Sequence, residues 1–164
     1  MDNLEEEITP QVRLMQAIVL GLAASPALFA IITLFLKLKP LGDDAAQLLV
    51  TIALSVGLVG LIAQHVLGDI VLNASVKSVG AAAFDEPEKL AGAYLSALLV
   101  SCALCEAAAF INLIAFMITR TPLTMAMGLL LVVASVIKFP TVGKVAGWAR
   151  RQMRDLRDRL KTAS

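Results

Sequence analysis

Apolar residues in this chain are gathered into four long blocks that are separated by short polar segments. The blocks cover residues 14–36, 46–67, 91–119 and 123–137. A helix that crosses a bilayer needs about 20 mostly apolar residues, and the fourth block reaches that length only with residues 138–142 included. The pattern predicts an all-α protein, a four-transmembrane-helix bundle with helices at about residues 12–38, 45–68, 90–119 and 122–139.

The chain after Pro140 changes in character, which predicts a second unit. Apolar residues recur there at helical spacing among many arginines, a pattern typical of a basic amphipathic helix that lies on anionic lipid headgroups. We therefore expect a membrane domain over residues 1–142 and a C-terminal basic helix over residues 143–164. The alternative is a solvated cytoplasmic helix with Arg–Asp pairs. The residues predicted to contact the membrane surface are Trp148, Arg150, Arg151, Arg154 and Arg157.

Composition and charge favour a multi-pass membrane protein of defined orientation. Of the 164 residues, 59% are hydrophobic, whereas soluble domains are about 45–50% apolar. The acidic N-terminus argues against a cleaved signal peptide, because such peptides begin with basic residues. Lys37, Lys39 and Arg120 lie in the first and third connections, and the other bases lie at the opposite helix ends. The positive-inside rule then predicts a protein of the bacterial inner membrane with both termini in the cytoplasm.

Glu106 is the one acidic residue deep inside an apolar block. A charged side chain at the bilayer centre costs about 2.5–3.5 kcal/mol on insertion scales, so an ionisable residue at that depth is a candidate functional site. Burial without a cation favours the protonated form of a carboxyl group. A protonated Glu106 could bind and release a proton, or it could act as a static hydrogen-bond donor that holds two helices together. The sequence leaves both roles open.

Depth along each predicted helix suggests neighbours for Glu106. At 1.5 Å per residue, its level corresponds to the middle of the first and second predicted helices. Pro26 frees the carbonyl of Leu22 at that level, because proline has no N–H to offer it. The predicted supporting residues are Ser25, Ser55 and Gly57.

Small side chains indicate where the helices approach closely, because lipid gives no hydrophobic drive for helix association. The third predicted helix carries small residues in steps of four, and Asn112 returns to the same face and could hydrogen-bond across helices. The small residues of this row are Ala93, Ala97, Ser101, Cys105 and Ala109.

Other catalytic or ligand-binding chemistry finds little support. Cys102 and Cys105 form a C-x-x-C, but a mid-helix position in lipid favours packing over redox chemistry. His65 is the single histidine, so we predict no metal site and no cofactor. No catalytic motif is present, which favours a non-enzyme. The basic tail lacks the aromatic cluster that stacks bases, so no nucleic-acid partner is predicted.

One stretch of the chain, at about residues 85–119, is similar to a known family. It begins Asp85-Glu-Pro-Glu-Lys-Leu-Ala-Gly and continues as Leu104-Cys-Glu-Ala-Ala-Ala-Phe-Ile-Asn-Leu-Ile-Ala-Phe. This resembles the rotor-ring c subunit, or proteolipid, of rotary ATP synthases, in which a polar loop ending in Pro-Glu opens a helix with a mid-membrane Glu-Ala. The resemblance implies that Glu106 is an ion-binding carboxylate. The whole chain also looks like small bacterial four-span membrane proteins, a likeness that implies no function.

Two functional expectations follow. The first is a c-subunit-like proteolipid that binds a proton at Glu106. The alternative is a non-catalytic membrane scaffold or an accessory subunit of a membrane complex. In either case the expected partners are the lipid bilayer and its anionic headgroups, with further copies of the chain or other subunits of a complex.

Overall fold

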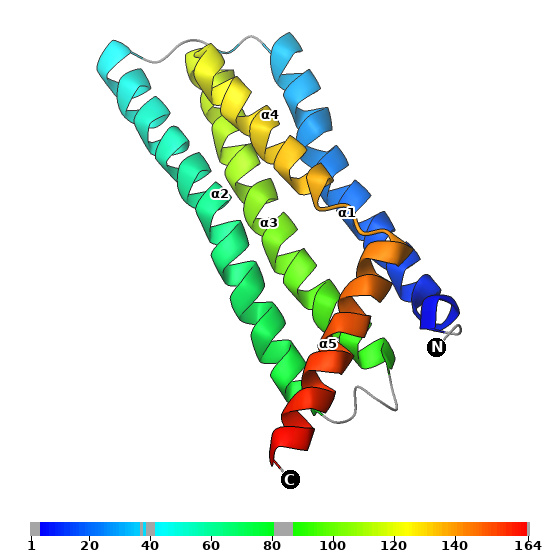
Figure 1. Ribbon diagram of the computed structural model, residues 1–164. Helices are drawn as coiled ribbons and strands as arrows, with labels where there is room; N and C mark the ends of the chain where they lie inside the picture. Colours follow the sequence, from blue (N-terminus) through cyan, green and yellow to red (C-terminus); the bar gives the residue numbers. More distant parts are fainter. Residues whose placement is uncertain (1–3, 37, 39–41, 81–86, 164) are drawn as a thin grey trace.

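The chain forms a helical bundle in the computed structural model, which describes residues 4–36, 38, 42–80 and 87–163. Figure 1 shows α1 to α4 running up and down side by side, with α5 folded across one end. Over the described ranges every regular element except one short 3₁₀ turn at Gly80 is an α-helix, which confirms the predicted all-α class. The helices are α1 (Leu4–Phe35), α2 (Asp43–Val79), α3 (Pro87–Thr119), α4 (Pro122–Ile137) and α5 (Val142–Ala163).

Three helices, α1 to α3, are each long and apolar enough to cross a membrane. A fourth span is obtained if α4 and α5, which meet at a 66° bend, are counted as one broken span. The helices are therefore compatible with a multi-pass membrane protein of three or four spans. Lys37, Lys39, Asp85 and Glu86 lie outside the described residues.

The observed helices α1 and α2 extend beyond the apolar blocks that predicted them. α1 begins at Leu4 rather than near residue 12, because Leu4, Ile8 and Val12 continue its buried face at steps of four. α2 runs on to Val79 instead of ending near residue 68. These extensions lie at the end of the bundle where α1 begins and α5 ends, which we call the terminal end (Figure 1).

α3 is the central helix and packs against the four others. Its contact with α2 is made by small residues on both sides. An added Cβ at Gly60 would meet Ala108, one at Gly57 would meet Asn112, and one at Gly68 would meet Ser101. The predicted row of small residues on α3 is buried, and the predicted bond across helices is present, because Asn112 Nδ2 donates to the carbonyl of Ala53 at 2.9 Å.

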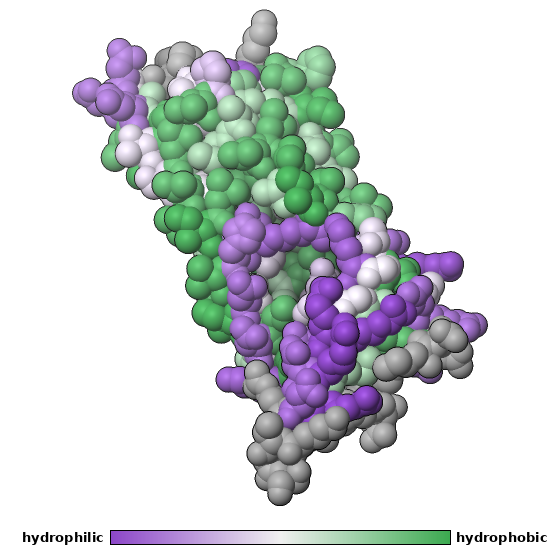
Figure 2. Space-filling model, viewed as in Figure 1, coloured by the Kyte–Doolittle hydropathy of each residue, from purple (hydrophilic) through white to green (hydrophobic). Residues whose placement is uncertain are grey.

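Large apolar side chains cover the outside of the bundle. On α2 they run from Leu48 to Ile70, and on α4 from Leu123 to Ile137. Figure 2 shows hydrophobic residues over most of this face and hydrophilic residues gathered towards the terminal end. A belt from Leu48 to Ile70 is about 33 Å tall at 1.5 Å per residue, which matches a hydrocarbon core about 30 Å thick.

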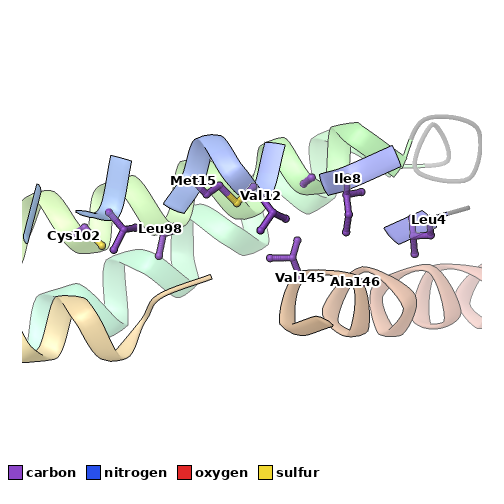
Figure 3. Close-up of a cluster of buried hydrophobic side chains, with 10 residues drawn as sticks. Leu4, Ile8, Val12, Met15, Leu98, Cys102, Val145 and Ala146 are labelled. Carbon is purple, nitrogen blue, oxygen red and sulfur yellow. The ribbon is translucent and has the colours of Figure 1, made fainter. Parts of the chain in front are cut away.

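The first part of α5 is held by a buried cluster at the terminal end. Ile8 and Val12 of α1 pack with Val145 and Ala146 of α5, and Leu98 and Cys102 of α3 complete the cluster. Figure 3 shows the α1 side chains and Val145 pointing towards one another between the ribbons. The bend before α5 is also tied down, because Gln16 Nε2 donates to the carbonyl of Pro140 at 2.9 Å. α5 is therefore packed on protein along this face.

Candidate functional site

Glu106 lies on the central helix, on the same stripe as Phe110 one turn further on, and is partly buried. The rings of Phe110 and Phe29 are in contact, with centroids 5.3 Å apart. α1 and α3 run in the same direction (Figure 1), so Ser25, one turn before Phe29, lies at the level of Glu106. The Ser25 side chain is exposed, and its supporting role stays a prediction.

The predicted supporting residues on α2 lie elsewhere. Gly57 packs against Asn112 and Met127, which places it more than one helical turn beyond the level of Glu106. Ser55 is exposed. Gly60, which faces Ala108 and the carbonyl of Leu104, is the α2 residue at the level of Glu106. Within the described part of the chain, no hydrogen bond or ion pair joins Glu106 to another side chain.

Gln64 is the centre of a polar network that links three helices. It is 2% exposed, and its backbone carbonyl accepts from Ser101 Oγ at 2.9 Å and from Lys138 Nζ at 3.3 Å. Its side-chain Oε1 accepts from Cys105 Sγ at 2.9 Å. A buried polar group is costly unless it is hydrogen-bonded, so these contacts stabilise the meeting point of α2, α3 and the end of α4.

A pocket of about 340 Å³ lies beside this network, between α2, α3 and the α4–α5 bend. We call it the lysine pocket, because Lys138 and Lys144 both line it, from the two sides of the bend. Figure 2 shows a hollow rimmed with hydrophilic residues in this region. Its other polar lining residues are Gln64, His65, Asp69, Tyr94 and Ser101.

The lysine pocket was not predicted from the sequence. Gln64 has no acidic or basic character and stands inside an apolar block, and Lys138 entered the prediction only within residues 138–142, which extend the fourth block. One available signal was the spacing of Gln64, seven residues after Gly57 and four before Gly68. That spacing places Gln64 on the same face of α2 as the two glycines, which is the face expected to pack against another helix. A polar side chain on that face is expected to hydrogen-bond to a partner inside the bundle.

Cys102 and Cys105 are both free and buried. Cys102 belongs to the cluster with α1 and α5, while Cys105 packs with Ala108, Ala109 and Leu131 and donates to Gln64. Each cysteine is thus part of a packing cluster, which fits the packing role. In the described ranges, no group of three or more His, Cys, Asp or Glu side chains is placed to hold a metal ion.

Of the residues predicted to contact the membrane surface, some pack against other helices of the bundle and some are exposed. Trp148 packs on Tyr94 with ring centroids 5.3 Å apart, and with Leu90 and Ala149 it forms a cluster that includes Val76 of α2. Arg150 pairs with Glu5 of α1 at 2.8 Å. The exposed members of the predicted set are Arg151, Arg154 and Arg157.

Comparisons with protein-family models, with curated proteins and with solved structures give no match.

Proposed function

We propose that this chain is a four-span protein of the bacterial inner membrane in which Glu106 binds a proton near the middle of the bilayer, in the manner of a c-subunit-like proteolipid. The observation that carries the proposal is the place of Glu106 on the central helix. It is partly buried, and it has no ion-pair partner among the described side chains. An ionisable side chain inside a membrane-spanning helix is a candidate functional site.

The depth of Glu106 is consistent with this proposal. Glu106 shares its level with Ser25 on α1 and with Gly60 on α2. Gly60 lies ten residues before Ile70, where the exposed apolar belt of α2 ends, and twelve after Leu48, where it begins. Glu106 therefore lies close to half-depth in a bilayer that this belt would span.

The number of spans and the orientation are parts of the same proposal. α4 has 16 residues, about 24 Å at 1.5 Å per residue, and Lys138 with the bend completes the crossing. Arg13, Lys77, Lys89 and the bases of α5 belong to the terminal end of the helices. The positive-inside rule assigns that end, and with it both termini, to the cytoplasm.

Carbodiimide labelling tests the proton site. The reagent attacks protonated carboxyl groups, so we expect Glu106 to be labelled selectively in membranes and faster as the pH falls. Glu88 is the matched control, because it lies exposed in the first turn of the same helix. Labelling of Glu106 no faster than of Glu88, at every pH tested, would contradict the proposal.

A second candidate function is a non-catalytic scaffold or accessory subunit. It is favoured by the seam between α2 and α3, where Gly57, Gly60 and Gly68 are used for packing within one chain and are not left to face a second copy. Particle mass in mild detergent separates the two candidates: a closed ring of many copies supports the proteolipid, and a monomer or dimer supports the scaffold. Function retained in Glu106→Gln, which keeps a hydrogen-bond donor, would also favour the scaffold.

A further inference from the structure

We propose that the lysine pocket binds a phosphate group, carried either by a phospholipid headgroup or by a free phosphate ester. The proposal does not depend on Glu106, which is not among the residues that line the pocket. Its basis is a cavity with two ammonium groups at its wall and a position at the edge of the apolar belt.

Lys138 and Lys144 bring positive charge that no ion pair neutralises within the part of the chain that the structure describes. Lys138 Nζ donates to the carbonyl of Gln64 at 3.3 Å, and Lys144 Nζ donates to the carbonyl of Phe139 at 3.4 Å. Both acceptors are uncharged, and among the described residues neither lysine has a carboxylate within ion-pair distance. A lysine ammonium has three donors, so each retains donors for a ligand.

Asp69 is the one carboxylate that lines the pocket, and it sits one helical turn from His65. It makes no ion pair with either lysine in the described structure. Two ammonium groups against one carboxylate leave the lining positive even with His65 neutral. Tyr94 and Ser101 add hydroxyl groups that can donate to phosphate oxygens.

The start of α5 adds to the positive potential. Thr141 precedes the helix, which begins at Val142 between the two lysines. Thr141 Oγ1 accepts from the N–H of Lys144 at 3.4 Å. The first amides of a helix have no acceptor within the helix. The N-terminal end of a helix carries a partial positive charge that favours anions.

The depth of the pocket points to a headgroup. Its lining on α2 runs from Gln64 to Leu72 and so spans Ile70, where the exposed apolar belt of that helix ends. At α4 the pocket is lined by Ile137, the last of the exposed apolar residues of that helix. The pocket thus extends from within the apolar belt, where Lys138 donates to Gln64, to beyond its end at Ile70, where lipid headgroups would lie. Leu98 and Ile137 in its lining are available to the apolar part of a lipid.

The walls are held in place by contacts that do not need a ligand. Gly68 approaches α3 so closely that an added Cβ would collide with Ser101 Oγ. Gln16 fixes the carbonyl of Pro140, and Gln64 fixes Ser101 and Lys138. A pre-formed site loses less conformational entropy on binding than one that must be ordered by its ligand.

Native mass spectrometry of the full chain in mild detergent tests the proposal, with phosphatidylglycerol, phosphatidylcholine and inorganic phosphate as probes. We expect one tightly held phosphatidylglycerol and about tenfold weaker binding in Lys144→Ala, because a charge-assisted bond is lost. Lys144→Arg should restore binding. Lys77→Ala is the matched control, since Lys77 is an exposed lysine of the terminal end outside this pocket.

The two sources of phosphate give different results. If the ligand is a lipid, millimolar inorganic phosphate leaves the bound phosphatidylglycerol in place; if it is a free phosphate ester, inorganic phosphate itself binds and Lys144→Ala abolishes that binding. Equal loss in Lys77→Ala and Lys144→Ala would overturn the proposal, as would retention of phosphatidylcholine as tight as that of phosphatidylglycerol. Lys138→Ala is a second variant, in which binding of phosphatidylglycerol should also weaken while the unfolding midpoint shows that the protein is still folded. Wild-type binding by folded Lys138→Ala would count against the site.

Discussion

Gly60 lies so close to Ala108 that a Cβ added to the glycine would come within 2.8 Å of the alanine Cβ. The contact belongs to the centre of the α2–α3 seam, and both partners lack a flexible side chain that could move aside. The backbones of two membrane-spanning helices therefore approach one another to a distance that this glycine sets. Such close approach allows extensive van der Waals contact, the main source of helix association in lipid.

Gly60→Ala should therefore destabilise the bundle. Overpacking of a filled contact costs about 1–3 kcal/mol, which we expect to exceed the gain in helix propensity of about 1 kcal/mol. Unfolding by sodium dodecyl sulfate measures the difference. Gly21→Ala is the control, because nothing lies within 4 Å of a Cβ added at that helical glycine. A loss of stability in Gly21→Ala equal to that in Gly60→Ala would contradict the steric explanation.

Arg120 directly follows the end of α3 and bonds through its side chain to the end of α1. Its guanidinium Nη1 donates to the carbonyl of Thr33 in the last turn of α1 at 2.8 Å. Its own φ is +57°, a conformation that costs a non-glycine residue about 1–2 kcal/mol. Arg120→Ala keeps that cost and loses the bond, so we expect a loss of stability of about 1–2 kcal/mol.

Arg120→Gly loses the same bond but removes the backbone cost. In order of unfolding midpoint, Arg120→Gly should therefore lie above Arg120→Ala and close to the wild type, because the two contributions are of similar size. Thermal unfolding in detergent can measure this order. If Arg120→Gly were less stable than Arg120→Ala, the positive φ would not be the source of the difference.

The sequence predicted the parts of the fold that depend on periodicity within one helix. The small row on α3 and the bond of Asn112 follow from spacing alone, because a helix fixes which residues share a face. Ser25 and Glu106 lie at the same level of the bundle, since α1 and α3 run in the same direction and Phe29 contacts Phe110. Gly57 lies beyond the level of Glu106, because it faces Asn112. That level depends on the register of α2 against α3, which no pattern within one helix specifies.

The lysine pocket depends on relationships that periodicity does not contain. Gln64 lies on α2, Ser101 on α3 and Lys138 directly after the end of α4. Their meeting depends on the register of each helix against the others and on the bend after Ile137. The apolar stripe of α5 was compatible with lipid and with protein alike. Its packing on Tyr94 and Leu90 depends on the angle at which α5 leaves the bend, which no local pattern specifies.

The two cysteines should be unreactive in the folded protein. Cys102 is 1% exposed and Cys105 is 0% exposed, so a maleimide cannot reach either thiol without unfolding. We expect no labelling by N-ethylmaleimide in mild detergent and labelling of two thiols after denaturation, as measured by intact mass. A Ser78→Cys variant is the positive control, because Ser78 is exposed beyond the apolar belt. Rapid native labelling of the wild-type chain would show that α3 opens readily.

The attachment of α5 to α1 should depend on apolar packing more than on charge. Arg150 and Glu5 form an ion pair, but their side chains are 40% and 50% exposed, and exposed pairs contribute about 0–1 kcal/mol. Ile8 is fully buried against the same helix, and truncation of a buried isoleucine to alanine costs about 2–5 kcal/mol. Ile8→Ala should therefore loosen α5 far more than Glu5→Ala.

Limited digestion with trypsin measures this difference, because the exposed side chains of Arg151 and Arg154 mark cleavage sites on α5 and a helix must open before it is cut. We expect cleavage of Ile8→Ala to be at least tenfold faster than cleavage of the wild type, and cleavage of Glu5→Ala to change by less than about fivefold, the equivalent of 1 kcal/mol. High salt should weaken the ion pair and leave cleavage of the wild type within the same limit. If Glu5→Ala and high salt both released α5 as strongly as Ile8→Ala does, the ion pair would be the main attachment, and the buried cluster at the terminal end would be secondary.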